Sequence, residues 1–194
     1  MSPYPIAVLV GSLRKESFNR KLADALARIA PRDFEFNQLR IDDLPPFDQD
    51  GEADPAPPVK RLKSEVLSAR GVLFVTPEYN RSIPGVLKNA IDHASRPYGQ
   101  SVWLGKPAGV IGISVGAIGT AVAQQHLRNV LAYLDVPTLG QPEAFLTAKE
   151  GFFDESGNIG SGSREFIQKW MDAYVAWVKA HAAPAGAGDA RRAA

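Results

Sequence analysis

Short apolar runs alternate along the chain with stretches in which apolar residues recur at helical spacing. Residues 6–10, 71–76 and 108–114 are almost continuously apolar and contain β-branched residues, which is typical of strands buried on both faces. Residues 34–39 alternate between apolar and polar, which predicts a strand with one wetter face near a sheet edge. Residues 142–147 are predicted to form a fifth and last strand.

The intervening stretches predict helices, because their apolar residues repeat every three or four positions and so share one face. The predicted helices cover residues 20–30, 59–67, 85–94, 121–135 and 164–181. Strands that alternate with helices form a parallel sheet whose right-handed crossovers place helices on both faces. We therefore expect an α/β protein, a three-layer sandwich around a five-stranded parallel sheet.

The remaining segments are connections and a tail. Residues 42–58 are rich in proline and acidic side chains, and we expect no regular structure there. Residues 153–158 are typical of a turn. A chain of 194 residues fits one domain, which we place at residues 1–182. Residues 183–194 are mainly alanine, glycine and arginine, and we expect this tail to be disordered.

Composition and charge exclude several classes of function. The formal net charge is +1, and the tail accounts for it through Asp189, Arg191 and Arg192, so the neutral body offers no field for nucleic acid or an anionic membrane. The chain has no cysteine, which excludes disulfides, thiolate metal sites and a cysteine nucleophile. No apolar run approaches the roughly 20 residues of a membrane span, and the first residues do not resemble a signal peptide. We expect a cytoplasmic protein.

The histidines and the aromatic residues of the last helix indicate packing rather than chemistry. His93, His126 and His181 lie in helical patterns with no partner at metal-ligand spacing, so we expect no metal. The aromatic residues at 170, 174 and 177 have the spacing of a core stripe. The G-x-S-x-G motif of many serine hydrolases is absent.

Residues 11–19 form the first candidate site. They link a buried strand to a helix, where free backbone N–H groups and the helix dipole favour an anion. Ser12, Ser17 and Asn19 can donate hydrogen bonds to phosphate oxygens, and the guanidinium of Arg14 can bind them as a fork. The segment is neither a P-loop nor a G-x-G-x-x-G dinucleotide loop. An ordinary helix capped by Ser17, with a solvated arginine, is the alternative interpretation.

Two further polar or glycine-rich loops follow buried strands. Residues 77–84 offer an aromatic ring, an amide, a carboxylate and exposed backbone, and residues 114–120 offer glycines that let a flat group approach the main chain. Because the carboxyl ends of parallel strands meet at one edge, the three loops are expected together there. They predict a site for a phosphorylated, planar, largely apolar ligand: a mononucleotide or a flavin. Taken singly, the second loop is equally consistent with a turn, and the glycines of the third with tight packing.

Two motifs resemble those of a known family. Residues 11–19 (GSLRKESFN), followed by Leu22 and Ala23, resemble the phosphate loop of the NADPH-dependent FMN reductase family. Residues 77–92 (PEYNRSIPGVLKNAID) closely resemble the second motif of that family, and the likeness extends over residues 5–180. Bacterial quinone and chromate reductases are the most similar branch. The resemblance implies a flavodoxin-like fold with strand order 2-1-3-4-5, non-covalently bound FMN, and a homo-oligomer, either a dimer or a homotetramer.

The resemblance also assigns residues to parts of the flavin. The residues that match the phosphate ligands are Ser12, Arg14, Ser17, the backbone around Phe18, and Asn19. The residues that match the loop behind the isoalloxazine ring, mostly through main-chain groups, are Pro77, Glu78, Tyr79 and Asn80. Those that match the third loop, beside the pyrimidine side of the ring, are Ser114 and Gly116, and Arg81 lies at the mouth of the site. Many members have tryptophan where this chain has His93.

The expected activity is that of an FMN-dependent NAD(P)H oxidoreductase. Two electrons pass from NADPH or NADH through bound FMN to small-molecule acceptors, such as quinones, azo dyes, chromate or free flavin. The flavin supplies the chemistry, so no catalytic side chain is assigned. The alternative is a flavodoxin-type electron carrier that binds FMN without nicotinamide turnover. Such carriers are usually strongly acidic, so the neutral body favours the enzyme.

Overall fold

The computed structural model describes residues 3–183, in which five parallel strands form one sheet in the order β2-β1-β3-β4-β5. The strands are β1 (Tyr4–Val10), β2 (Phe34–Gln38), β3 (Gly71–Val75), β4 (Ala108–Ser114) and β5 (Phe145–Thr147). The predicted α/β class and strand order are confirmed. The expected tail lies outside the described residues from residue 184 onward.

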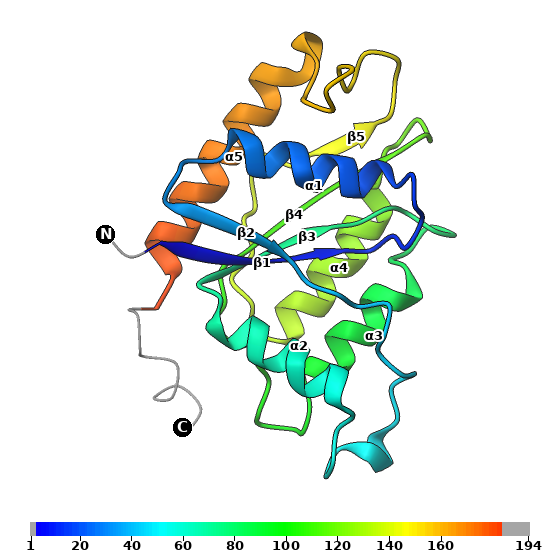
Figure 1. Cartoon of the computed structure of the whole chain (residues 1–194), viewed down its shortest axis with the longest axis vertical. Helices are drawn as coiled ribbons and strands as arrows, with labels where there is room; N and C mark the ends of the chain where they lie inside the picture. The colour runs from blue at the N-terminus through cyan, green and yellow to red at the C-terminus, as the bar shows by residue number, and fades with distance from the viewer. Residues whose placement is uncertain (1–2, 184–194) are drawn as a thin grey trace.

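Helices cover both faces of the sheet (Figure 1). They are α1 (Phe18–Ile29), α2 (Pro57–Ser68), α3 (Gly85–Ala94), α4 (Ala121–Tyr133) and α5 (Ser161–His181). Side chains on β1 alternate between the two layers of core. Ile6 and Val8 face the core formed with α1 and α5, whereas Ala7 and Leu9 face the core formed with α2, α3 and α4. This two-sided burial explains why β1 reads as a continuous apolar run.

The aromatic stripe of α5 belongs to the core, as predicted. Trp170 and Tyr174 are fully buried with their rings stacked 5.6 Å apart, and Trp177 packs at the margin. The hydroxyl of Tyr174 has no hydrogen-bond partner, and burial raises its pKa well above the ordinary value. The stripe is therefore structural and carries no chemistry.

The expectation of an irregular segment over residues 42–58 is wrong at two places. Gln49–Gly51 form a 3₁₀ turn, and α2 begins already at Pro57 because proline is well suited to the first turn of a helix. The predicted last strand is shorter than expected, and α5 begins three residues before the predicted start at residue 164.

The connection between β2 and α2 is held on α3 by side chains one turn apart. Asn89 accepts a hydrogen bond from the backbone N–H of Phe47 at 2.7 Å and donates one to the carbonyl of Pro45 at 2.8 Å. His93 Nε2 lies 2.9 Å from the same carbonyl, and its ring packs edge-on against Phe47. A carbonyl oxygen only accepts, so this nitrogen carries a proton. His93 is a packed histidine, as predicted.

Because Gly112 has no side chain, β4 packs directly against Thr76 and Thr120. A Cβ at this position would lie 2.0 Å from the carbonyl oxygen of Thr76 and 2.5 Å from the hydroxyl oxygen of Thr120. Both neighbours are fully buried and begin or end the loops that follow β3 and β4. The missing side chain thus allows these two loops to pack directly on β4.

No helix within residues 3–183 is both long and apolar enough to cross a membrane. The same residues contain no group of three or more histidine, aspartate or glutamate side chains placed to hold a metal ion.

We predict that Gly112→Ala destabilises the protein by about 1–3 kcal/mol, because the added methyl group overlaps a backbone oxygen that cannot move aside. The melting temperature should fall by about 2–4 °C for each kcal/mol in a protein of this size. Gly162→Ala in α5 is the matched control, since nothing lies within 4 Å of its Cβ position. Equal melting temperatures for the two variants in thermal unfolding would contradict the predicted overlap.

Candidate functional site

The three candidate loops lie at one edge of the sheet, where β1, β3 and β4 end (Figure 1). The first loop begins beside the end of β3, because the backbone N–H of Gly11 donates a hydrogen bond to the carbonyl of Val75 at 2.9 Å. A Cβ on Gly11 would lie only 3.2 Å from Pro77 and from Pro84, so the first and second loops are in close contact. The predicted clustering of the loops is confirmed.

The first loop presents unpaired donors around the start of α1. Ser17 caps the helix, since its hydroxyl accepts a hydrogen bond from the N–H of Arg20 at 3.2 Å. Within residues 3–183 the N–H groups of Phe18 and Asn19 and the hydroxyl of Ser12 make no hydrogen bond. Ser12 and Ser17 are each only 3% exposed. The helix is therefore capped by Ser17, and unpaired donors remain beside the cap.

The charges of the first loop favour an anion as well. Residues 14–21 contain four cations and a single carboxylate, that of Glu16. A hydrogen bond from Lys21, and the charge of that lysine, lower the pKa of Glu16 and keep it paired. The exposed guanidinium of Arg14 makes no hydrogen bond or ion pair in the described chain. A cation without a bound partner thus borders the free donors.

Asn19 differs from the expectation in one respect. Its side-chain amide donates to the carbonyl of Ile113 at 2.9 Å and accepts from the N–H of Ile113 at 3.1 Å. β3 ends at Val75, which pairs with Ile111, so no strand reaches the backbone groups of Ile113 on that side. The amide of Asn19 takes the place of the missing strand. Its backbone N–H and the second hydrogen of its side-chain amide make no hydrogen bond within residues 3–183.

The second loop contains a two-residue hairpin. The N–H of Tyr79 donates to the carbonyl of Ser82, and the N–H of Ser82 donates to the carbonyl of Tyr79, both at 3.0 Å. Asn80 and Arg81 have φ of 51° and 64°, so both central residues are left-handed, as in a type I′ turn. The tyrosine ring at the base of this hairpin is 45% exposed.

Glu78 joins the second loop to the third. One carboxylate oxygen, Oε2, accepts hydrogen bonds from the N–H groups of Val122 and Ala123 at 3.0 Å each. These are first-turn donors of α4, and Thr120 at the N-cap supplies no side-chain bond. The other oxygen, Oε1, accepts from Arg81 Nη1 at 3.1 Å, which holds the left-handed arginine in place. The sequence did not predict this cap, because the partners lie 44 and 45 residues apart.

The third loop is closed by its own hydrogen bonds. The hydroxyl of Ser114 donates to the carbonyl of Gly119 at 2.6 Å and accepts from the N–H of Gly116 at 3.2 Å. Gly119 has φ of 59°, and a Cβ there would meet the backbone of β5 at 2.7 Å, so this glycine is required for both reasons. Ser114 and Gly116 therefore shape the loop and have few hydrogen-bonding groups left.

Large apolar side chains stand exposed on all three loops. The exposed ones are Leu13, Tyr79, Val115 and Ile118. The unpaired donors near α1 are suited to a phosphate. The exposed apolar side chains are suited to a flat apolar group. One part of this edge therefore offers free N–H and hydroxyl groups, and another part exposes apolar side chains.

The comparisons with known proteins agree with this geometry. Residues 4–151 match the family described as NADPH-dependent FMN reductase. A 2-hydroxy-1,4-benzoquinone reductase from a Burkholderia species is 55% identical over 175 residues, which cover 90% of this chain and 96% of the relative. A quinone reductase from Pseudomonas putida is 49% identical over 91% of this chain and 95% of the relative.

A solved structure is similar over almost its whole length. FerB, a flavoenzyme NAD(P)H:(acceptor) oxidoreductase from Paracoccus denitrificans, superposes with a TM-score of 0.89 at 44% identity and covers 93% of this chain and 100% of its own. The family match spans most of the chain, and the relatives match it nearly end to end. The chain therefore belongs to the NADPH-dependent FMN reductase family and is a flavodoxin-like oxidoreductase.

Proposed function

We propose that this protein binds FMN at the three loops and catalyses the reduction of quinones by NAD(P)H. The observation that carries the proposal is the division of one sheet edge into unpaired phosphate donors on the first loop and exposed apolar side chains on all three. A 1,4-benzoquinone is the proposed class of acceptor, which the name of the 55% identical relative supports.

The phosphate end of FMN is assigned to the first loop. Ser12, Ser17 and the backbone N–H groups of Phe18 and Asn19 would donate to the phosphate oxygens, with Arg14 supplying a fork from the solvent side. Asn19 acts here through its main chain, because its side chain is bound to Ile113.

The ring end is assigned to the second and third loops. Pro77, Tyr79 and Asn80 would back the ring, mainly through main-chain groups. Glu78 is a positioning residue, since both of its carboxylate oxygens already accept hydrogen bonds from the protein. Arg81 remains at the mouth of the site, paired with Glu78, and Ser114 and Gly116 shape the third loop.

FMN held at these loops would supply hydride and two-electron transfer, so that NAD(P)H, one proton and quinone give NAD(P)⁺ and hydroquinone. The protein's part is to hold the reactants at the strand ends and to set the electrostatics there. Arg14 and the free N–H groups in the first turn of α1 would stabilise negative charge on the cofactor. No side chain of the site is required as a general acid or base.

The direct test is an absorbance spectrum of the protein loaded with FMN, before and after NADPH, followed by turnover with 1,4-benzoquinone. We expect the flavin band to bleach on NADPH addition and to return on addition of the quinone. If FMN stays bound but NADPH does not bleach the flavin band, the protein is an electron carrier instead. Protein that binds no FMN would overturn the proposal altogether.

We predict that Arg14→Ala weakens FMN binding by about ten- to hundredfold, because it removes a charge-assisted contact of roughly 1.5–3 kcal/mol. Titration of apoprotein with FMN measures the dissociation constant. Arg164→Ala, an exposed arginine of α5, is the control and should bind FMN as the parent does. Unchanged affinity in the Arg14 variant would mean that the phosphate lies elsewhere.

We also predict that Glu78→Ala lowers stability by about 0.5–2 kcal/mol, the usual cost of losing a helix cap, and weakens FMN binding. The hairpin of the second loop loses its anchor to α4 in this variant. Thermal unfolding and FMN titration measure the two effects. Glu155→Ala removes an exposed carboxylate in the turn before α5 and should change neither quantity. A stability loss with unchanged FMN affinity would reject the positioning role.

The oligomeric state and location are part of the same proposal. We propose a homo-oligomer, a dimer or homotetramer, with α4 at an interface, because Tyr133 at its end is 82% exposed. A cytoplasmic location is consistent with the absence of cysteine. Sedimentation velocity measures the assembly, and a monomer at micromolar concentration would contradict it.

A further inference from the structure

A cavity of about 410 Å³ lies beside the first loop, at the same sheet edge. It is bordered by Val10 and Leu13, by Arg20 in the first turn of α1, and by residues 38–42 after β2. The cavity exists because β2 ends at Gln38, which pairs with Val8, while β1 continues for two more residues. Its volume is within the range of small-molecule sites.

The cavity combines an apolar floor with two guanidinium groups. Val10 and Ile41 are almost fully buried, whereas Arg20 and Arg40 are exposed at its border. The guanidinium of Arg20 makes no hydrogen bond or ion pair within residues 3–183. A planar fork of donors over an apolar floor suits a phosphate attached to a flat ring system.

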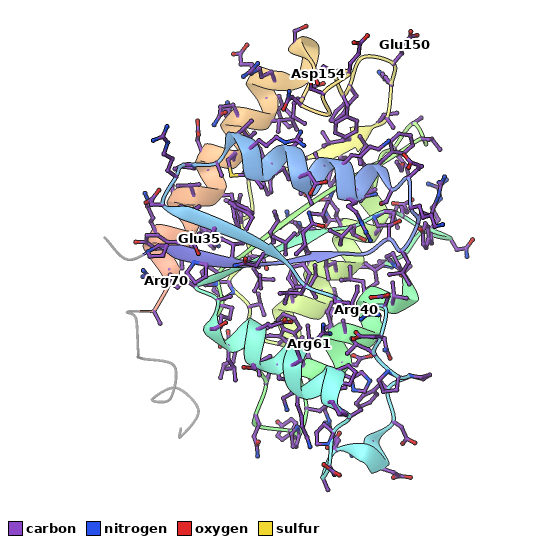
Figure 2. The ribbon with its side chains drawn as sticks, viewed as in Figure 1. Glu35, Arg40, Arg61, Arg70, Glu150 and Asp154 are labelled. Atoms are coloured by element: carbon purple, nitrogen blue, oxygen red, sulfur yellow. The ribbon has the colours of Figure 1, made fainter. Side chains whose placement is uncertain are left out.

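Arg40 is held in position by its surroundings. Arg61 of α2 donates from Nη2 to the carbonyl of Arg40 at 2.8 Å and to Asp43 Oδ1 at 3.0 Å, and Figure 2 shows the two labelled arginines beside each other. The side chain of Arg40 donates from Nε to Asp42 Oδ1 at 2.9 Å. This hydrogen bond, with weaker help from the charges of Arg40 and Arg20, lowers the pKa of Asp42.

The state of the carboxylates near the cavity determines whether it suits a ribose 2′-hydroxyl or a 2′-phosphate. Asp42 lines the cavity but is already paired with Arg40, and Gln38 is engaged with Asp24 at 2.6 Å. In dinucleotide-binding sheets of the order 3-2-1-4-5-6, an acidic residue binds the free ribose 2′-hydroxyl and an arginine accommodates a 2′-phosphate. The same chemistry applies to the groups of this cavity, although the strand order differs. Here Asp42 is ion-paired with Arg40, and Asp43 is ion-paired with Arg40 and Arg61. Arg20 adds a guanidinium that has no partner within residues 3–183, so the balance favours the phosphate.

The position suits one end of a dinucleotide. The cavity lies at the ends of β2 and β1, and the apolar side chains of the third loop lie at the end of β4. β2 and β4 are three strand spacings apart, which is about 14 Å across the sheet edge. An extended dinucleotide spans this distance with its nicotinamide over the second and third loops.

We propose that this cavity binds the adenosine end of the nicotinamide dinucleotide, and that Arg20 and Arg40 hold its 2′-phosphate, so that the enzyme prefers NADPH to NADH. The inference rests on the proposed function, which leaves the choice of electron donor open. Two other exposed arginines lie at this edge: Arg14 is assigned to the phosphate of FMN, and Arg81 is on the second loop, outside the lining of the cavity.

Binding of two small nucleotides to the FMN-loaded protein tests the cavity without turnover. Adenosine 2′,5′-bisphosphate and 5′-AMP differ only in the 2′-phosphate, and calorimetry measures both dissociation constants. We expect the bisphosphate to bind at least about tenfold more tightly than AMP. Equal affinities in the parent protein would overturn the proposal.

Two glutamine variants locate the phosphate. Arg20→Gln removes a guanidinium that has no bound partner, so it leaves no carboxylate unpaired, and it should reduce the tenfold advantage to about threefold or less. Arg40→Gln should do the same. Arg32→Gln, an exposed arginine before β2 at the opposite sheet edge, is the matched control and should keep the full advantage. An advantage that survives in both the Arg20 and Arg40 variants would contradict the assignment.

Kinetics separate this inference from the proposed function. In the Arg20 variant, kcat/KM should fall about tenfold for NADPH and change little for NADH. Equal losses with both donors, or none with NADPH, would reject the specificity role. If neither donor bleaches the flavin of the parent protein, the proposed function fails, and the calorimetric comparison still decides whether the cavity takes a 2′-phosphate.

Discussion

The reciprocal amide pair between Asn19 and Ile113 fixes the relation of the first loop to the rest of the sheet edge. It spans 94 residues of sequence and fills the place of a strand that has ended. Buried backbone groups that lack partners cost roughly 1–3 kcal/mol each, so β4 can extend past β3 only with this side chain in place. The start of α1, and with it the free donors of the first loop, is thereby set against β4. The carboxylate of Glu78 does the same for the second and third loops.

Most of the fold follows from patterns that are local in sequence. The apolar runs of β1, β3 and β4 and the helical spacing between them reflect burial, which acts on every residue of an element. The clustering of the three loops then follows from parallel topology alone. The start of α2 does not follow from this pattern, because proline marks a break in most sequence contexts but also fits the first turn of a helix.

The roles predicted for the candidate site residues were all roles toward the ligand, and contacts of these side chains within the chain were not predicted. Asn19 and Glu78 were both assigned toward a ligand, and both side chains are bound to backbone groups of distant segments. Sequence spacing contains no signal for such contacts, because they depend on where the strands end relative to one another. The required absence of a side chain at Gly112, and the cavity after β2, are likewise products of register and not of any local motif.

The hairpin at Tyr79–Ser82 has a consequence for the thermodynamics of binding. Its two backbone hydrogen bonds, its left-handed tip and the arginine–carboxylate contact are all formed within the chain itself. The conformational entropy of this segment is therefore lost during folding and not when a ligand arrives. The role proposed for this hairpin is to back the ring. A wall that is formed before binding would meet flat acceptors of different outline without adapting to each, so a broad acceptor range and a rigid site are compatible.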